Sequence, residues 1–498
     1  MLFCLLACSS SEKANESKHT IDFLFTNGTI QINSTETIPS IGVHEGRFVT
    51  PTSSATQVID LDGAIMVPGF HDSHTHLLAG SFVFDKLLLV GVSNMNTVKN
   101  KVEEYIATAP DLPWVVGYGW ITSLMDNPSG VALDSISNGY PIALFDSAGH
   151  SLMVNSIAME MAGITADTPV PVGGEIEHDE NGNPTGILRE SAVGLVSALM
   201  VASFSDEQLV SNLQTTVETF HESGITSISE ILAVPGVNLD KPELYAQEET
   251  KLRVHYYLPI FSADNLTNLE AHLDDQDPYL RFVGGKVWVD GSSGSGESWS
   301  LEESLIEEGH YGSHYFNTEE LLPFIRHAEE HHYDLKLHVN GDAATQSALD
   351  ALETIEAELG SLNSRYIFDH LLMVAPGDYG RMLALGITAS IQPSHALVGL
   401  YGDQADHWGS ERMEGAWDFS RLENEGLQIA MGTDWPVWPT PDAMVNYRTA
   451  VEGVLERSIS REIGFDAYTI NGVEAVGYEL ETGTIEVGKW ADFVILSE

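Results

Sequence analysis

Cysteine is nearly absent from this sequence, and basic residues are scarce. The 498 residues include two cysteines, Cys4 and Cys8, both within the first ten positions. The remainder of the chain therefore has no disulfide framework, no zinc finger and no cysteine nucleophile. Lysine and arginine number 22 against 73 aspartates and glutamates, a formal net charge of −51. A surface of this sign repels phosphate backbones and anionic headgroups, so we expect neither a nucleic-acid partner nor a polybasic membrane contact.

Long apolar runs are also missing. No stretch approaches the ~20 apolar residues of a membrane span, although hydrophobic residues make up 43% of the chain and can form a large core. The short apolar start ends in Leu5-Leu6-Ala7-Cys8. It resembles a bacterial lipoprotein signal, which predicts a lipid on Cys8, a tether over residues 9–20 and a place on the periplasmic side of the cell envelope. The alternative is an incidental apolar start of a cytoplasmic protein.

The secondary-structure pattern of the sequence divides the chain into two β-rich ends and a long middle part in which strand and helix patterns alternate. Short strand-like runs separated by turns occupy residues 21–61, and residues 483–496 look similar. After residue 61, strand patterns alternate with helical patterns such as those at residues 317–332 and 344–359. Such alternation predicts βαβ units and a parallel sheet.

Eight strand patterns can be counted in this middle part, which predicts a TIM (β/α)8 barrel. They lie at residues 64–70, 224–230, 252–260, 280–289, 335–339, 366–370, 387–392 and 427–432. We assign the barrel to residues 64–77 and 208–470. Residues 78–207 are too long for a loop and contain strand patterns of their own. We therefore predict an inserted α/β subdomain over the barrel mouth, after the first barrel strand.

Histidines, a lysine and an aspartate fall at the ends of the predicted barrel strands. His74 and His76 follow the first strand and point to the same side of an extended chain, so both can bind one ion. On its own this pair is also compatible with two surface histidines. The further residues lie on the fourth strand, at the ends of the fifth and sixth, and after the eighth: Lys286, His338, His370 and Asp434. TIM-barrel active sites are built on that face, and four imidazoles with a carboxylate suit a divalent metal, zinc first.

The sequence motifs around these residues resemble those of the amidohydrolase superfamily, and within it those of amidohydrolase family 3, the branch that contains N-substituted formamide deformylase. The matching motifs include Pro68-Gly-Phe-His-Asp-Ser-His-Thr-His76, Lys286-Val-Trp-Val-Asp-Gly-Ser292, His338-Val-Asn-Gly-Asp342, Gly432-Thr-Asp-Trp-Pro436 and Gly483-Thr-Ile-Glu-Val-Gly-Lys-Trp-Ala-Asp492. The resemblance covers nearly all of the chain from residue 21. It implies a TIM barrel with a small β-sandwich formed by residues 21–63 and 471–498.

The resemblance also implies a metal site and a reaction. His74 and His76 would bind one divalent ion, His338 and His370 a second, and a carboxylated Lys286 would bridge them. Asp434 would bind metal and transfer the proton. Hydroxide formed from a metal-activated water would then hydrolyse an amide-type C–N bond, other than a peptide bond, in a small molecule. If Lys286 instead pairs with an acid such as Asp290, the site holds one metal.

The sequence departs from the family pattern at three positions, and it also contains candidate residues for substrate contacts. Ala343 stands where many members have Arg, Asp369 where Glu is usual, and Glu230 where Asp is common. Substrate contacts are expected from Trp120, Asp146, His150 and Trp435. The first three could equally serve the fold, whereas a place in the pocket is favoured for Trp435 because it adjoins Asp434. The alternatives in function are a deaminase or cyclic-amide hydrolase with the same metals, and a barrel that binds a ligand without catalysis.

Overall fold

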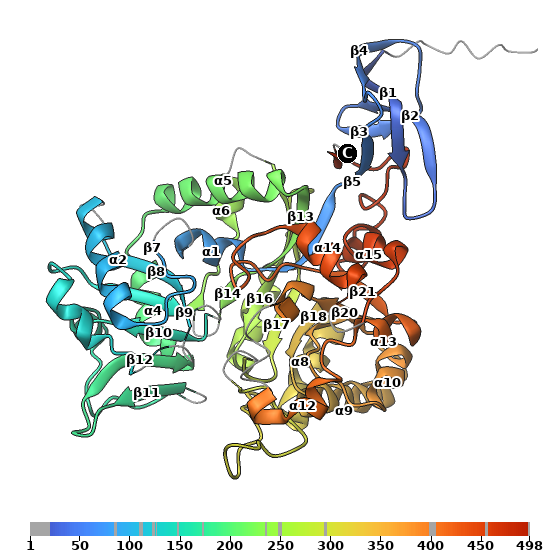
Figure 1. The fold of residues 1–498 in the computed structure, drawn as a ribbon. Coiled ribbons are helices and arrows are strands. Elements are labelled where there is room, and N and C mark those ends of the chain that lie inside the picture. Colours follow the sequence, from blue (N-terminus) through green and yellow to red (C-terminus); the bar gives the residue numbers. More distant parts are fainter. Residues whose placement is uncertain are drawn as a thin grey trace, which may run out of the picture.

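The computed structural model describes residues 20–83, 87–108, 113–121, 125, 127–146, 149–171, 174–234, 237–247, 251–292, 296–397, 405–453 and 457–496. Cys8 and residues 9–19 of the predicted tether lie outside these ranges. Three large sheets organise the described part of the chain, namely a barrel, an inserted sheet and a sheet shared by both chain ends (Figure 1).

The barrel sheet has eight strands, and each strand runs parallel to its neighbours in chain order, as predicted for a TIM barrel. Its strands are β6 (Phe70–Thr75), β13 (Ile225–Ile231), β16 (Arg253–Ile260), β17 (Leu280–Trp288), β18 (Asp334–Val339), β19 (Tyr366–His370), β20 (Thr388–Ile391) and β21 (Gln428–Met431). All but the first predicted range overlap these strands almost completely.

Amphipathic helices connect the strands and cover the barrel. They include α5 (Asp206–Glu222), α6 (Glu243–Ala246), α7 (Leu266–Glu270), α8 (Thr318–His331), α9 (Asp342–Leu359), α10 (Asp378–Ala384), α12 (Ser410–Met413), α13 (Phe419–Asn424), α14 (Ala443–Glu452), α15 (Arg461–Ala467) and α16 (Ile470–Glu474). Helix α8 begins where predicted, because the Asn317 side chain accepts the N–H groups of Glu319 and Glu320. Among the described residues, no helix alone has the length and apolarity to cross a membrane; one pair bent by 110°, Ser191–Val201 with Asp206–Glu222, passes that test jointly.

The first and last barrel strands meet through the loop that follows β21. The Asp434 N–H donates to the His74 carbonyl at 2.8 Å, and the His76 N–H donates to the Trp435 carbonyl at 2.8 Å. Glycine is required at position 432, because a Cβ there would lie 2.5 Å from the His74 nitrogen. Two motifs more than 350 residues apart in sequence, about residues 68–76 and 432–436, therefore lie side by side.

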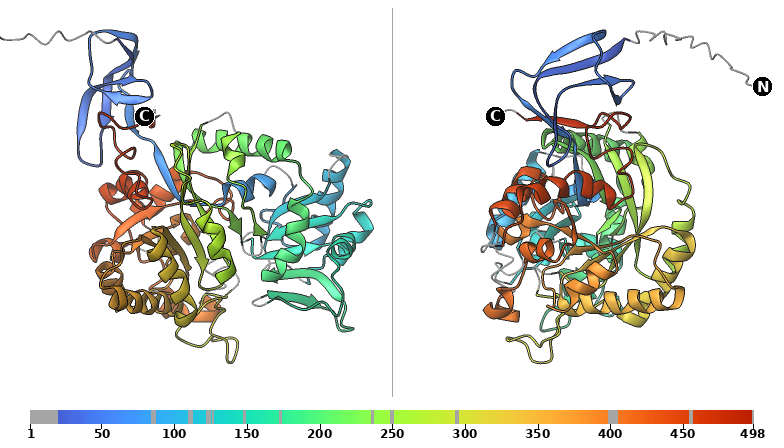
Figure 2. Two further views of the ribbon diagram at one scale, coloured as in Figure 1. Left: turned by 180° about the vertical axis from the view of Figure 1, so that it is seen from behind. Right: turned by 90° about the vertical axis from the view of Figure 1, so that its right-hand side faces the viewer.

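The insertion forms its own mixed sheet beside the barrel. Its strands are β7 (Leu87–Leu88), β8 (Val115–Trp120), β9 (Ile142–Asp146), β10 (Ser151–Val154), β11 (Gly174–His178) and β12 (Pro184–Glu190). Its helices include α1 (Leu77–Val83), α2 (Met95–Thr108), α3 (Ser156–Ala162) and α4 (Gly194–Val201). Viewed from behind, the insertion and the sheet of the chain ends lie at different sides of the barrel (Figure 2).

The sheet shared by both chain ends consists of β1 (Ile21–Gln31), β2 (Thr37–His44), β3 (Arg47–Val49), β4 (Ala55–Asp60), β5 (Ile65–Pro68) and β22 (Phe493–Leu496). Strand β22 pairs antiparallel with β5, which pairs in parallel with β1. The described strands form one hydrogen-bonded sheet of six. The union of both ends is as expected, whereas the two-layer sandwich stays a prediction.

Both predicted boundaries of this terminal part differ from the structure. Ile65–Pro68, assigned to the first barrel strand, pairs in the terminal sheet, and the barrel strand starts at Phe70. Gly69 separates the two strands and donates its N–H to the Asp492 carbonyl. The continuous apolar segment of the sequence around Gly69 therefore contributes strands to two different sheets. At the other end, the Asn471 side chain on α16 donates to the Ile429 carbonyl of β21, which places α16 with the barrel.

Candidate metal centre

Strand β6 contains His74 and ends at Thr75, so His76 is the first residue after the strand. His76 Nδ1 donates to the Ala233 carbonyl at 2.7 Å, which leaves the Nε2 lone pair directed at Asp434 Oδ1, 3.3 Å away. His74 Nε2 lies 3.3 Å from the same carboxylate oxygen. Both side chains are buried. The predicted pair therefore faces one acid from the end of one strand, the arrangement that a shared metal ion needs.

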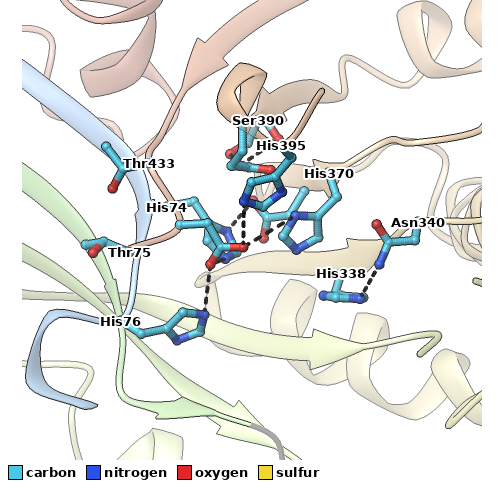
Figure 3. A network of polar contacts seen from close by, with 12 residues as sticks. His74, Thr75, His76, His338, Asn340, His370, Ser390, His395 and Thr433 are labelled. Atoms are coloured by element: carbon cyan, nitrogen blue, oxygen red, sulfur yellow. Dashed lines mark hydrogen bonds and ion pairs between the residues drawn. The ribbon is translucent and has the colours of Figure 1, made fainter. Parts of the chain in front are cut away.

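His370 and His338 approach the same point from β19 and β18 (Figure 3). Their ring centroids are 4.4 Å apart, and the His370 ring lies 4.9 Å from that of His74. His370 has a φ of +75°, a conformation rare outside glycine that is typical of functional sites. Burial holds the pKa of both imidazoles well below the ordinary value. They are therefore neutral at pH 7, the form that ligates a metal.

A fifth histidine, His395, belongs to this cluster and was missed by sequence reasoning. It lies on a 3-10 turn, Pro393–Leu397, directly after β20, and its Nε2 is 3.6 Å from Asp434 Oδ2. This nitrogen is buried and has no hydrogen-bond partner among the described residues. The signal was present, since Pro393-Ser-His395 directly follows the seventh predicted strand, at the barrel end where ligands are expected.

Asp434 occupies the centre of the cluster and is held there through its neighbour. Asp72 on β6 accepts the Thr433 N–H at 2.9 Å and the Thr433 hydroxyl at 2.5 Å. Asp434 itself has a φ of +53°. Burial would raise the pKa of its carboxyl, but the surrounding histidines, His74 first, hold the pKa well below the ordinary value. The carboxylate is therefore ionised at neutral pH.

Lys286 lies below this cluster, in the barrel interior. Its amine contacts one oxygen of Asp369, whose other oxygen is 2.9 Å from His74 Nδ1 and 2.9 Å from the amine of Lys336. Its partner is therefore Asp369 and not Asp290, which instead accepts the backbone N–H groups of residues 299, 340 and 341. Burial lowers the pKa of Lys286 to about 8, against the attraction of Asp369. This shift favours the uncharged amine that carboxylation requires.

The donor set fits divalent metal. Ligand atoms of His74, His76 and Asp434 lie within 4.8 Å of one another, and so do those of His370, His395 and Asp434. Neutral imidazoles around one buried carboxylate are the ligands that zinc and similar ions prefer. His395 stands in the second group where His338 was expected. The Nε2 of His338 instead accepts a hydrogen bond from the Asn340 amide at 2.8 Å, so its role as a ligand stays a prediction.

The insertion brings two of the expected substrate-contact residues to the barrel end. The His150 ring centroid is 6.4 Å from that of His338, and its Nδ1 lies 2.7 Å from Glu190 Oε2. The hydroxyl of Tyr315, from the loop after β17, donates to the same oxygen at 2.6 Å. Asp146 accepts the Ser151 N–H at 3.0 Å, and burial raises the pKa of its carboxyl to about 6.

The other two expected contacts, Trp120 and Trp435, lie in the core. Trp120 is buried in the hydrophobic cluster of the insertion, where its indole donates to the Leu144 carbonyl. An irregularity of β8 at Gly119, with φ +105°, turns this side chain to the face opposite its expected one.

Trp435 follows Asp434, and its ring is buried in the main hydrophobic core. It packs edge-on against Phe220 of α5 and directly over Gly80 of α1, where a Cβ would lie 2.0 Å from the ring. A glycine is needed at this position of α1 because the indole fills the space. Trp435 was expected in the pocket because it adjoins Asp434, but the left-handed backbone of Asp434 begins a turn in which the indole packs into the core.

Comparison with known proteins agrees with this geometry. The amidohydrolase family matches residues 57–498. The chain is 30% identical over 515 residues to Protein LONG AFTER FAR-RED 3 of Arabidopsis thaliana, covering 96% of this chain and 87% of that protein. It is 24% identical over 467 residues to N-substituted formamide deformylase of Arthrobacter pascens, covering 88% and 84%.

Solved structures show the same fold. An uncharacterized metal-dependent hydrolase from Pyrococcus furiosus matches with a TM-score of 0.77 and 23% identity, covering 96% of this chain and 99% of that one. The barrel, the histidines gathered around Asp434 and the match over residues 57–498 together lead to one conclusion. The chain belongs to the amidohydrolase family of metal-dependent hydrolases, in the branch known as amidohydrolase family 3.

Proposed function

We propose that this protein hydrolyses an amide-type C–N bond, other than a peptide bond, in a small molecule. The observation that carries the proposal is the buried carboxylate of Asp434, within 3.3 Å of both His74 and His76 and 3.6 Å from His395. This set combines imidazole ligands for a divalent ion with an ionised group that can accept a proton. The relative named N-substituted formamide deformylase makes formamides the first substrates to test.

The residues of the centre have separate roles in metal binding and in proton transfer. A bound zinc or similar ion supplies an acidified water and polarises a carbonyl group. His74 and His76 would hold an ion on one side of Asp434, and His370 with His395 or His338 a second one on the other. Asp434 accepts the proton of the attacking water at its carboxylate and returns it to the leaving nitrogen. A carboxylated Lys286 would join the two positions.

The test is a substrate panel with purified protein. N-acyl amines, formamides, cyclic amides and aminated heterocycles are incubated with zinc-loaded protein, and the released amine or ammonia is measured. We expect one of the first two classes to react, to lose activity after chelation and to regain it with zinc. Reaction of an aminated heterocycle alone would identify a deaminase and overturn the proposal, as would turnover that survives complete removal of the metal.

We further propose that His150 donates a hydrogen bond to the substrate carbonyl oxygen. Glu190 binds Nδ1, so Nε2 lies on the opposite side of the ring. Burial lowers the pKa of His150, but the charge and hydrogen bond of Glu190, together with the charges of Asp146 and Asp434, outweigh burial and raise the pKa above the ordinary value. A second nitrogen that carries a proton can stabilise negative charge as it develops on oxygen.

His150→Ala is therefore expected to lower kcat/KM by about a hundredfold, the usual loss when one such donor is removed. Zinc content measured by mass spectrometry should not change, since His150 is not among the proposed ligands. Tyr315→Phe is the matched control, because it removes one contact to Glu190 and keeps the His150 contact; its loss should be much smaller. Equal kcat/KM in wild type and His150→Ala would contradict this role.

A further inference from the structure

Two histidines and a glutamate gather on the outer face of the barrel, away from the centre described above. His327 and His331 are one turn apart on α8, and their rings stack with centroids 4.2 Å apart at an interplanar angle of 24°. Residues four apart on a helix face the same way. Glu270, the last residue of α7, lies against both rings. Three ligand atoms from two helices therefore meet at one point of the surface.

The distances match those around a zinc ion. Glu270 Oε1 is 3.2 Å from His327 Nε2 and 3.9 Å from His331 Nε2. In tetrahedral coordination with bonds of about 2.1 Å, neighbouring ligand atoms are about 3.4 Å apart. Ligand atoms of all three residues lie within 4.8 Å of one another, and their partly exposed side chains are free to adjust around an ion.

The His327 ring is also held in the orientation that a ligand needs. Its Nδ1 lies 2.8 Å from the hydroxyl of Tyr333, and Tyr333 is buried. With Nδ1–H donated to that oxygen, the lone pair of Nε2 is directed toward Glu270. A fixed partner on the second ring nitrogen is the usual support of a histidine ligand and changes metal affinity by about 10–100-fold.

We propose that Glu270, His327 and His331 form a separate zinc site on the barrel surface, which joins α7 to α8. The three protein ligands leave a coordination position for water. The net charge of −51 raises the local concentration of cations around the protein and favours occupancy. The proposal is independent of the reaction in the barrel, because none of its residues contributes to the centre around Asp434.

Zinc stoichiometry tests this site in the full-length protein. Wild type and the His327→Ala/His331→Ala variant are equilibrated at the same chelator-buffered, micromolar free zinc, and bound metal is counted by mass spectrometry. We expect the double variant to bind one equivalent less. His178→Ala, which removes an exposed histidine of the insertion, should bind as much as wild type. Equal stoichiometry in wild type and the double variant would overturn the proposal.

Two further variants separate a designed site from incidental binding. Tyr333→Phe keeps all three ligands and should weaken zinc affinity at this site by about tenfold, through the loss of the Nδ1 contact. His331→Gln removes one ligand but keeps the helix surface polar. It therefore tests whether the double variant loses zinc because its ligands are missing rather than because it misfolds. Circular dichroism of each variant should match wild type. Unchanged zinc affinity in both single variants would also contradict the assignment.

Discussion

Replacing Asp434 by Asn is expected to lower kcat about a thousandfold, since a positioned general base contributes typically 10²–10⁴ to the rate. Asn has nearly the same shape as Asp, but an amide cannot accept the proton of the attacking water. The His74, His76, His370 and His395 imidazoles remain, so most of the affinity for metal should be kept. The measurement is kcat on the best substrate of the panel, with zinc content determined for the same sample.

The backbone at position 434 should tolerate the Asp434→Asn substitution, so that a loss of activity can be separated from a loss of stability. Asp434 has a positive φ and its N–H donates to the His74 carbonyl, and Asn tolerates this conformation well. The unfolding midpoint should therefore stay close to that of wild type. Near-normal turnover in a zinc-loaded Asp434→Asn protein would exclude Asp434 as the group that transfers the proton. Low turnover with lost zinc would show that it acts chiefly as a ligand.

Removing the Asp369 carboxylate is expected to have the largest effect on stability. Asp369 is fully buried and contacts the amines of Lys286 and Lys336 as well as His74. Asp369→Ala leaves two buried amines without their anion. Breaking a buried ion pair from one side costs roughly 3–5 kcal/mol. The free energy of unfolding of the metal-free protein, measured by urea denaturation, should fall by about that amount.

The matched comparison is an ion pair on the surface. Arg326 and Glu358 are joined by three hydrogen bonds, but both side chains are half-exposed. Glu358→Ala should therefore cost less than about 1 kcal/mol. If Asp369→Ala were no more destabilising than Glu358→Ala, the buried pair would contribute little and the interior lysines would have other partners.

The loss caused by Asp369→Ala should also depend on pH. Burial raises the pKa of Asp369, but His74, Lys286 and Lys336 outweigh it and hold the pKa well below the ordinary value. The folded protein therefore binds this proton less readily than the unfolded chain. The stabilisation is complete at neutral pH and is lost as the pH falls below the ordinary Asp value toward the folded one. The difference between wild type and Asp369→Ala should shrink accordingly in acid.

The barrel could be predicted because its strands are short apolar runs between turns, and five of them carry a predicted ligand on or just after the strand, namely His74, Lys286, His338, His370 and Asp434. The same rule explains the error at the first strand. Residues 65–68 and 70–75 are separated by Gly69 alone, and nothing in their local pattern tells that they pair in different sheets. Strand membership depends on partners such as β22, which lies hundreds of residues away.

The site was predicted where ligands follow strands and mispredicted where packing decides. The partner of Lys286 was sought nearby in sequence, at Asp290, but it is Asp369, 83 positions away on a different strand. Trp120 is turned by a strand irregularity, and Trp435 lies in a turn that follows the left-handed Asp434; neither effect is visible in composition or spacing. Side-chain direction at an irregular backbone position requires coordinates.

Both sheets that involve the N-terminal strands are completed by strands near the other end of the chain. Strand β5 pairs with β22, and β6 is joined to the loop after β21. During synthesis at about 5–20 residues per second, these early strands have an unpaired edge for roughly 20–90 s. The insertion, whose strands all lie within residues 87–190, has no such delay. The insertion can therefore fold well before the histidines of β6 meet Asp434, and the sheet of the chain ends is completed last, when β22 has been synthesised.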